Sequence, residues 1–161
     1  MHILHMEDDR TLRSLLHVAL TAAEPSVKLQ QFIGSDNALE YIEQQIKDID
    51  LFVLDIRVPG ELNGLDLAVK IREMGGTGVI IMTSAYSKPP ENLLRLNNLE
   101  WMSKPWHIME VPPRMFELIR DRRKNNTTTT TASVDSNSAG NGNHNGRNNL
   151  SSKGRINPIK H

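Results

Sequence analysis

Short apolar runs alternate five times with segments whose apolar residues recur at helical spacing, and this alternation constrains the fold more than any other feature. In two of the runs, residues 51–54 and 79–82, every residue is apolar. Such runs are typical of strands that are covered on both faces of a parallel sheet. Five strand–helix units in strict succession therefore predict an α/β fold, with a doubly wound, five-stranded parallel sheet and helices on both faces.

The other expected strands cover residues 3–6, 27–33 and 101–103. Helical spacing predicts a first helix over residues 10–23, with Asp9 placed to cap it. Ser35 is placed to cap the second helix, and the third carries apolar residues between 65 and 69. Pro90 and Pro112 suit the first turns of the last two helices, because proline is tolerated there.

Composition excludes several classes of protein. The 161 residues include no cysteine, so there is no disulfide framework, thiolate metal site or cysteine nucleophile. The formal net charge is zero, which does not demand nucleic acid as a partner. No apolar run approaches the roughly 18 residues of a membrane span. Acidic residues begin at Glu7, too early for a signal peptide, so we expect a cytoplasmic protein with no membrane partner.

The character of the chain changes at Asn125. Residues 127–131 are all threonine, and residues 136–149 are dominated by Asn, Ser and Gly. Such a segment buries too little apolar surface to offset the entropy of ordering it. We therefore expect one domain over residues 1–124 and a disordered, low-complexity tail over residues 125–161.

Polar side chains follow four of the expected strands. Glu7 and Asp8 follow the first strand, Asp55 the third, residues 83–84 the fourth and Lys104 the fifth. The carboxyl ends of parallel strands share one rim, where ligands bind. Carboxylates, a hydroxyl and a lysine on that rim predict a site for a hard cation and an anionic group.

This set of groups suits phosphoryl transfer. A carboxylate can attack a phosphoryl group and form an acyl phosphate, with a divalent cation and an ammonium to stabilise the developing charge. Asp55 is the best nucleophile candidate, because it ends the central apolar run. Glu7 and Asp8 are the best cation-binding pair. Three carboxylates this close should raise the pKa of at least one of them when no cation is bound.

These stretches resemble the receiver domain of two-component response regulators over about residues 1–123. The matching pieces are residues 3–9 with 12–16, residues 54–60 with 64–67, residues 80–85 and residues 101–106. The resemblance implies a flavodoxin-like sheet with strand order 2-1-3-4-5. It also implies a single-domain regulator of a phosphorelay, because no DNA-binding domain is recognisable.

The resemblance assigns roles to individual residues. Asp55 is implied as the phosphoryl acceptor, with Asp8 as a direct Mg²⁺ ligand and Glu7 acting mainly through water. The main-chain carbonyl of Arg57 would be the third protein ligand of the ion. Lys104 would pair with a phosphoryl oxygen.

Two further residues are implied in switching. Ser84 matches the hydroxyl that follows the phosphoryl group, and Thr83 is the less favoured candidate. Trp101 lies three residues before Lys104, where the family carries a switch aromatic. The family's usual output face is formed by the fourth helix, fifth strand and fifth helix. A short fourth helix and the prolines at 112 and 113 alter that face, so we expect a monomer or weak dimer.

The implied function is Mg²⁺-dependent phosphoryl acceptance from a sensor histidine kinase or a histidine phosphotransfer protein. It includes switching of a protein-interaction face and self-dephosphorylation, the activity of a switch rather than of a metabolic enzyme. One alternative is a phosphorylation-independent adaptor, although the full set of acids, hydroxyl and lysine disfavours it. A flavin or nucleotide binder is a second alternative, disfavoured because Asp8 and Asp9 stand where a glycine-rich phosphate loop would be.

Overall fold

The computed structural model describes residues 1–132, with side chains through Asn125. The part of the predicted tail from residue 133 onward lies outside the described residues. The strands are β1 (His2–Met6), β2 (Lys28–Phe32), β3 (Leu51–Asp55), β4 (Val79–Ser84) and β5 (Glu100–Ser103). The helices are α1 (Arg10–Ala23), α2 (Ser35–Gln45), α3 (Gly64–Glu73), α4 (Glu91–Leu96) and α5 (Val111–Ala132).

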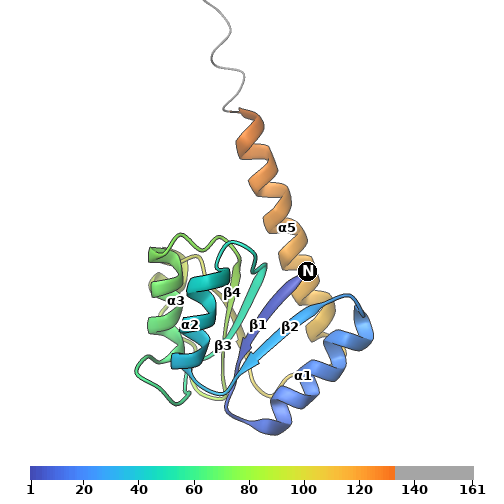
Figure 1. Ribbon diagram of the computed structural model, residues 1–161, viewed down its shortest axis with the longest axis vertical. Coiled ribbons are helices and arrows are strands. Elements are labelled where there is room, and N and C mark those ends of the chain that lie inside the picture. Colours follow the sequence, from blue (N-terminus) through green and yellow to red (C-terminus); the bar gives the residue numbers. More distant parts are fainter. Residues whose placement is uncertain (133–161) are drawn as a thin grey trace, which may run out of the picture.

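The sheet has five strands in the order β2-β1-β3-β4-β5. Every neighbouring pair is parallel. Figure 1 shows α2 and α3 on one side of the sheet and α1 and α5 on the other. The prediction of a flavodoxin-like, doubly wound parallel sheet is therefore confirmed.

Alternating side chains divide the interior into two cores, one on each face of the sheet. In β3, Phe52 and Leu54 pack on the face that α2 and α3 cover, whereas Leu51 and Val53 pack toward α1 and α5. The α2/α3 core is formed by Leu4, Met6, Ala38, Ile42, Ile49, Phe52, Leu54, Leu67, Ala68, Ile71, Ile80, Met82, Leu94 and Leu99. The α1/α5 core is formed by Ile3, Leu16, Leu20, Leu51, Val53, Val79, Ile81, Val111, Met115 and Ile119.

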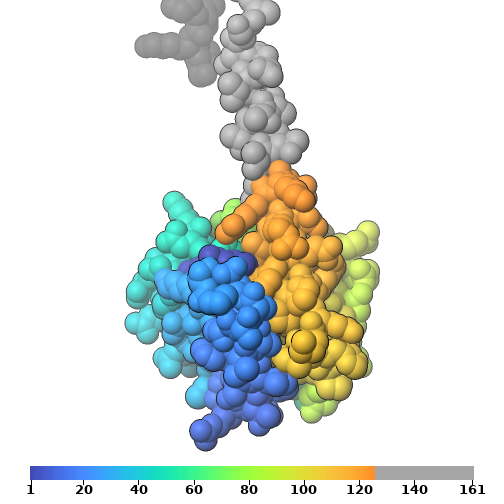
Figure 2. Space-filling view, turned by 90° about the vertical axis from the view of Figure 1, so that its right-hand side faces the viewer, coloured from blue at the N-terminus to red at the C-terminus, as the bar shows by residue number. Residues whose placement is uncertain are grey.

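The α1/α5 layer is visible from outside as two adjoining helices. Figure 2 shows the side chains of α1 and α5 meeting along one face of the molecule. Inside that layer, Leu16 and Leu20 of α1 are fully buried, as is Met115 of α5. Full burial of a side chain of this size contributes about 2 kcal/mol, so these contacts fix where α1 begins and hence where Asp8 lies.

Two expected helix caps have different outcomes. Asp9 caps α1 as predicted, because its carboxylate accepts a hydrogen bond from the Leu12 N–H at 2.9 Å. Ser35 does not cap α2: Gly34 is the N-cap residue, and Ser35 is the first residue of the helix. The buried Ser35 hydroxyl instead accepts a hydrogen bond from the N–H of Leu62, in the loop that follows β3.

The limits of the last two helices also differ from expectation. Pro90 is the N-cap of α4 rather than its first helical residue. The last helix begins at Val111 and continues to Ala132, past the predicted end at Lys124. Extending a helix that is already docked requires no new nucleation, so even poor helix formers continue it. Helix α5 therefore runs eight residues past the end that the sequence predicts for it.

No helix among the described residues has both the length and the apolar character needed to cross a bilayer.

Candidate functional site

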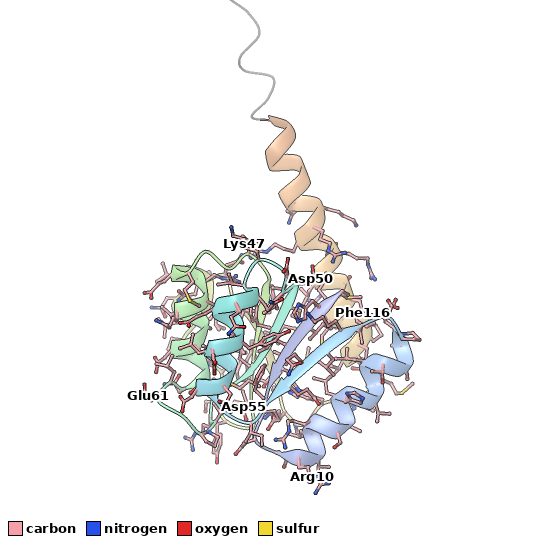
Figure 3. All side chains as sticks on the ribbon, viewed as in Figure 1. Arg10, Lys47, Asp50, Asp55, Glu61 and Phe116 are labelled. Carbon is pink, nitrogen blue, oxygen red and sulfur yellow. The ribbon has the colours of Figure 1, made fainter. Side chains whose placement is uncertain are left out.

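The carboxyl ends of β1, β3, β4 and β5 bring the expected polar residues to one rim of the sheet. Figure 3 shows Asp55 at the end of β3 that faces the start of α1, with Asp50 at the opposite end of the same strand. The pairing of Asp55 with Thr83, and of Ser84 with Ser103, places these residues at neighbouring strand ends. The parallel topology thus assembles the site from segments that are far apart in the sequence.

Lys104 joins two carboxylates at the centre of this rim. Its ammonium donates to Asp55 Oδ2 at 2.8 Å and also forms an ion pair with Glu7. The side chains of Lys104, Asp55 and Glu7 are 7%, 9% and 1% exposed. Burial opposes the charge of Lys104, but the hydrogen bonds to Asp55 and Glu7 outweigh it and raise the lysine's pKa.

Glu7 is the carboxyl group whose protonation the site favours most clearly. Burial raises the pKa of Glu7, and the negative charge of Asp55 adds to that effect. The hydrogen bond from Lys104 opposes the rise without cancelling it. The expected rise in pKa of one carboxyl group thus occurs at Glu7, with burial as its main cause and the Asp55 charge as a smaller one.

Glu7, Asp8 and Asp55 form an acidic cluster that suits a hard cation. One carboxylate oxygen from each residue lies within 4.8 Å of the other two. Glu7 and Asp55 are buried, whereas Asp8 is exposed, which leaves the cluster open on one side. A shallow hollow beside it is lined by Asp8, Ile56, Arg57, Val58, Pro59 and Asn63. Oxygen donors with an open side fit Mg²⁺, which keeps several water ligands.

The loop after β3 is held against the start of α2. The Ser35 N–H donates to the Pro59 carbonyl at 2.9 Å. The Glu61 N–H donates to the Asp36 carboxylate at 2.9 Å, and the Leu62 N–H donates to the Ser35 hydroxyl at 3.2 Å. These bonds hold residues 59–62 of the loop against the first turn of α2.

Glycine is required where α3 meets the backbone of Asp55. A Cβ added to Gly64 would lie 2.1 Å from the Asp55 carbonyl oxygen, well inside contact distance. Gly60, earlier in the same loop, has a φ of +124°, which L side chains rarely adopt. Gly64 thus lets the start of α3 approach Asp55, and Gly60 lets the loop turn against Ser35 and Asp36 of α2.

Ser84 lies near the rim, on the same face of the sheet as Trp101. Ser84 is 2% exposed, and its hydroxyl accepts a hydrogen bond from the Tyr86 N–H at 3.1 Å. Met82 belongs to the α2/α3 core, so alternation along β4 places Ser84 on that face too. Trp101 pairs with Met82 in register and packs against the same core. Ser84 and Trp101 therefore lie on the same face of the sheet, on neighbouring strands.

Thr83 differs from Ser84 in face and in partners. It lies opposite Asp55 in the register and two residues after Ile81, so alternation places it on the α1/α5 face. It is completely buried, and its hydroxyl has no hydrogen-bond partner among the described residues. The two hydroxyls are thus distinguishable by mutation.

The sequence analysis missed two contacts beside the predicted residues. The Arg57 guanidinium lies 3.9 Å from the centre of the Tyr86 ring, whereas only the Arg57 carbonyl was expected to take part. His5, treated as part of an apolar strand, is completely buried, with its ring centre 5.9 Å from that of Trp106. A histidine within an otherwise apolar strand is the signal that could have revealed the second contact.

Comparisons with known proteins agree with this geometry. The family model for the response regulator receiver domain matches residues 3–114. Response regulator RppA of Synechocystis is 27% identical over 122 residues, which cover 74% of this chain and 51% of RppA. Response regulator ArlR of Staphylococcus aureus is 30% identical over 123 residues, which cover 73% of this chain and 52% of ArlR. The chain thus spans about half the length of these curated relatives.

Solved structures show the same fold. A receiver domain protein from Methanospirillum hungatei has a TM-score of 0.65 at 16% identity, covering 77% of this chain and 97% of its own. The receiver domain of the hybrid histidine kinase CckA has a TM-score of 0.61 at 24% identity. The match covers 74% of this chain and 99% of the CckA chain. With the family model covering most of the sheet and its helices, the chain belongs to the response regulator receiver domain family of two-component signal transduction.

Proposed function

We propose that this receiver domain accepts a phosphoryl group on Asp55 from a phosphohistidine donor, with Mg²⁺ bound by Asp8, Asp55 and the Arg57 carbonyl and with Glu7 acting mainly through water. The observation that supports this most strongly is the buried Asp55 carboxylate, which shares one lysine with Glu7 beside the exposed Asp8. The donor would be a sensor histidine kinase or a histidine phosphotransfer protein.

The reaction exchanges one bond for another at phosphorus. A carboxylate oxygen of Asp55 attacks, the phosphorus–nitrogen bond to the donor histidine breaks, and its electron pair returns to the imidazole. Asp55 is held for this attack by the Arg57 N–H, 3.3 Å from Oδ1, and by Lys104 at Oδ2. Mg²⁺, when bound, offsets charge that develops on the phosphoryl oxygens.

Once Asp55 is phosphorylated, Lys104 would contact the phosphoryl group and Asp8 would bind the cation. The Lys104 ammonium, already within hydrogen-bond distance of Asp55, can pair with a phosphoryl oxygen. Asp8 and the Arg57 carbonyl would complete the protein ligands of the cation, and Glu7 would act mainly through water. Because the cluster is open at Asp8, water can reach the acyl phosphate, which accounts for the proposed self-dephosphorylation.

Switching would follow from the new charge. A phosphoryl group brings three strong acceptor oxygens, and the Ser84 hydroxyl can donate to one of them. The Ser84 hydroxyl accepts a hydrogen bond from the Tyr86 N–H, and it would donate its own proton to the phosphoryl oxygen as the side chain moves toward Asp55. Trp101, on the same face, can then occupy the vacated space, because packed cores hold discrete arrangements. The downstream partner would recognise this altered surface.

We place the end of the folded receiver body at residue 124. The last side chain of α5 in the α1/α5 core is Ile119, and Arg123 forms an ion pair with Asp50 at 2.7 Å. Residues beyond 124 would act outside that body.

The test is phosphoryl incorporation into the full chain from acetyl phosphate with Mg²⁺, followed by intact mass. One phosphoryl group should be added to the wild type, stable in acid and removed by hydroxylamine. Asp55→Asn should abolish the label. Asp48→Asn, an exposed aspartate that precedes β3, is the matched control and should label fully. Full labelling of Asp55→Asn would contradict the assignment.

A further inference from the structure

The main chain of the acidic pair is held by one arginine. Arg13, in the first turn of α1, donates from Nη1 to the Glu7 carbonyl at 2.6 Å and to the Asp8 carbonyl at 2.7 Å. Charge-assisted hydrogen bonds of this kind are roughly twice as strong as neutral ones. The guanidinium therefore fixes the direction of the chain at the two residues whose carboxylates belong to the acidic cluster.

Arg13 is in turn tied to the edge of the sheet. The side-chain amide of Gln31, on β2, donates to the Arg13 carbonyl at 2.9 Å and pairs with His5 Nδ1 at 3.0 Å. Because the Arg13 carbonyl can only accept, the side-chain nitrogen of Gln31 faces both partners, so His5 Nδ1 accepts and the ring proton is on Nε2. The chain of contacts thus runs from β1 through β2 to α1 and returns to the end of β1.

Packing alone does not explain these residues. His5 is completely buried beside apolar neighbours such as Ile3. Burying an imidazole costs free energy unless it is hydrogen-bonded, and an aliphatic residue would fill this strand position without that cost. The bond to Gln31, which also holds Arg13, satisfies Nδ1 of this ring, whereas Nε2 is buried without a partner among the described residues.

We propose that Arg13, Gln31 and His5 form a positioning clamp that orients the carboxylates of Glu7 and Asp8 for the cation. The inference rests on the proposed function, because it concerns how that same site binds Mg²⁺. These residues do not ligate the ion; Arg13 acts through the main chain of the ligands, and the other two act through Arg13. Residues that orient metal ligands typically change metal affinity by 10–100-fold when they are lost.

The loss of Arg13 should change the Mg²⁺ affinity in opposite directions, depending on whether its charge or its positioning role matters more. Removing a positive charge near three carboxylates should strengthen cation binding if charge alone matters. If the clamp matters, Arg13→Gln should weaken Mg²⁺ binding roughly tenfold. Arg10→Gln is the matched control: Arg10 is exposed at the start of α1 (Figure 3), carries the same charge and makes none of the contacts to the Glu7 or Asp8 carbonyl.

A second variant leaves the net charge unchanged. Gln31→Leu removes the amide that holds Arg13 and His5, and Gln30→Leu, one residue earlier on β2, is its control. We expect Gln31→Leu to weaken Mg²⁺ binding about fivefold, less than Arg13→Gln because the guanidinium is still present. Gln30→Leu should change the affinity less than twofold.

The measurements are the Mg²⁺ dissociation constant by calorimetry, the melting temperature, and amide hydrogen exchange at Asp8 and Asp9 without metal. The clamp predicts weaker binding and faster exchange at these two amides in Arg13→Gln and Gln31→Leu, but not in Arg10→Gln or Gln30→Leu. A lower melting temperature with unchanged affinity and exchange would overturn the clamp, as would tighter Mg²⁺ binding in Arg13→Gln. Wild-type protein that binds no Mg²⁺ would instead contradict the proposed function.

Discussion

The two ends of β3 carry aspartates in opposite electrostatic situations. Asp50, immediately before the strand, accepts from Arg123 at 2.7 Å and from the His2 N–H at 2.8 Å, so each carboxylate oxygen has its own donor. Asp55, at the other end, shares Lys104 with Glu7 and lies beside Asp8. One end is a balanced ion pair, and the other is a cluster of three carboxylates with one paired cation.

The pKa directions follow this difference. At Asp50, burial opposes ionisation, but the hydrogen bonds from Arg123 and His2 outweigh it and lower the carboxyl pKa. At Glu7, burial and the Asp55 charge raise the pKa despite Lys104. The comparison shows that Asp50, with a donor for each oxygen, stabilises the fold. The cluster of Glu7, Asp8 and Asp55 has more negative than positive charge and so favours an additional cation.

Removal of the lysine should produce the largest change in stability. Lys104→Met leaves Glu7 and Asp55 buried without their cation, which should destabilise the metal-free protein by about 3 kcal/mol. Arg123→Met, at the balanced end, should cost about 1 kcal/mol or less, because that arginine is 61% exposed. Urea denaturation measures both, and equal losses would remove the distinction between the two ends.

Metal affinity should separate the acidic cluster from other surface acids. Asp8→Ala should weaken Mg²⁺ binding at least tenfold, which corresponds to about 1.4 kcal/mol. Asp48→Asn should leave the affinity unchanged within error. Calorimetric titration of both variants provides the measurement, and an unaltered affinity in Asp8→Ala would move the cation site elsewhere.

The switch should depend on one of the two neighbouring hydroxyls. In a Trp106→Phe background, beryllofluoride with Mg²⁺ should change Trp101 fluorescence, because this mimic of the acyl phosphate draws Ser84 toward Asp55. Ser84→Ala should suppress the response, and Thr83→Ala, on the opposite face, should retain most of it. The reverse pattern would assign the switch hydroxyl to Thr83, and a silent Trp101 would leave it a packing residue only.

Stability should respond to pH in opposite directions at the two ends. The raised folded-state pKa of Glu7 contributes stability that is present at low pH and is lost as pH rises through that pKa. The lowered pKa of Asp50 contributes stability that is present near neutrality and is lost as pH falls through its folded value. Glu7→Gln should therefore stabilise the metal-free protein at pH 7, whereas Asp50→Asn should destabilise it. Denaturation curves of the wild type and both variants at pH 4 and pH 7 measure whether each substitution raises or lowers the free energy of unfolding.

The smallest effect is expected from truncation. A chain that ends at Lys124 keeps both cores and the Arg123–Asp50 ion pair, so its stability should change by no more than about 0.5 kcal/mol. Its phosphorylation rate from acetyl phosphate should equal that of the full chain. A large loss of stability would show that residues beyond 124 contribute to the receiver body.

The sheet and the candidate site were predictable because both follow from periodicity and topology. Uninterrupted apolar runs such as residues 51–54 indicate strands buried on both faces, and parallel strands bring their carboxyl ends together. Asp55 and Lys104 could therefore be placed on one rim before any contact was known. Their roles in chemistry stay predictions until labelling is measured.

The clamp and the helix limits were not predictable in this way. The Gln31 side chain contacts the Arg13 carbonyl and the His5 ring, which joins three elements, and no spacing in the sequence encodes these contacts. Ser35 is a sound cap by residue type, but its burial against the loop after β3 assigns its hydroxyl to Leu62. The extension of α5 to Ala132 reflects propagation from a docked helix rather than intrinsic propensity.

The most direct test of the central claim is to map the phosphorylated residue. Wild-type protein treated with acetyl phosphate and Mg²⁺ would be reduced with borohydride, which converts a phosphorylated aspartate to homoserine, and sequenced by tandem mass spectrometry. The unbalanced cluster predicts homoserine at position 55 alone, and none when Mg²⁺ is omitted. Modification at Asp50 or Asp8, or metal-independent modification at several aspartates, would contradict it.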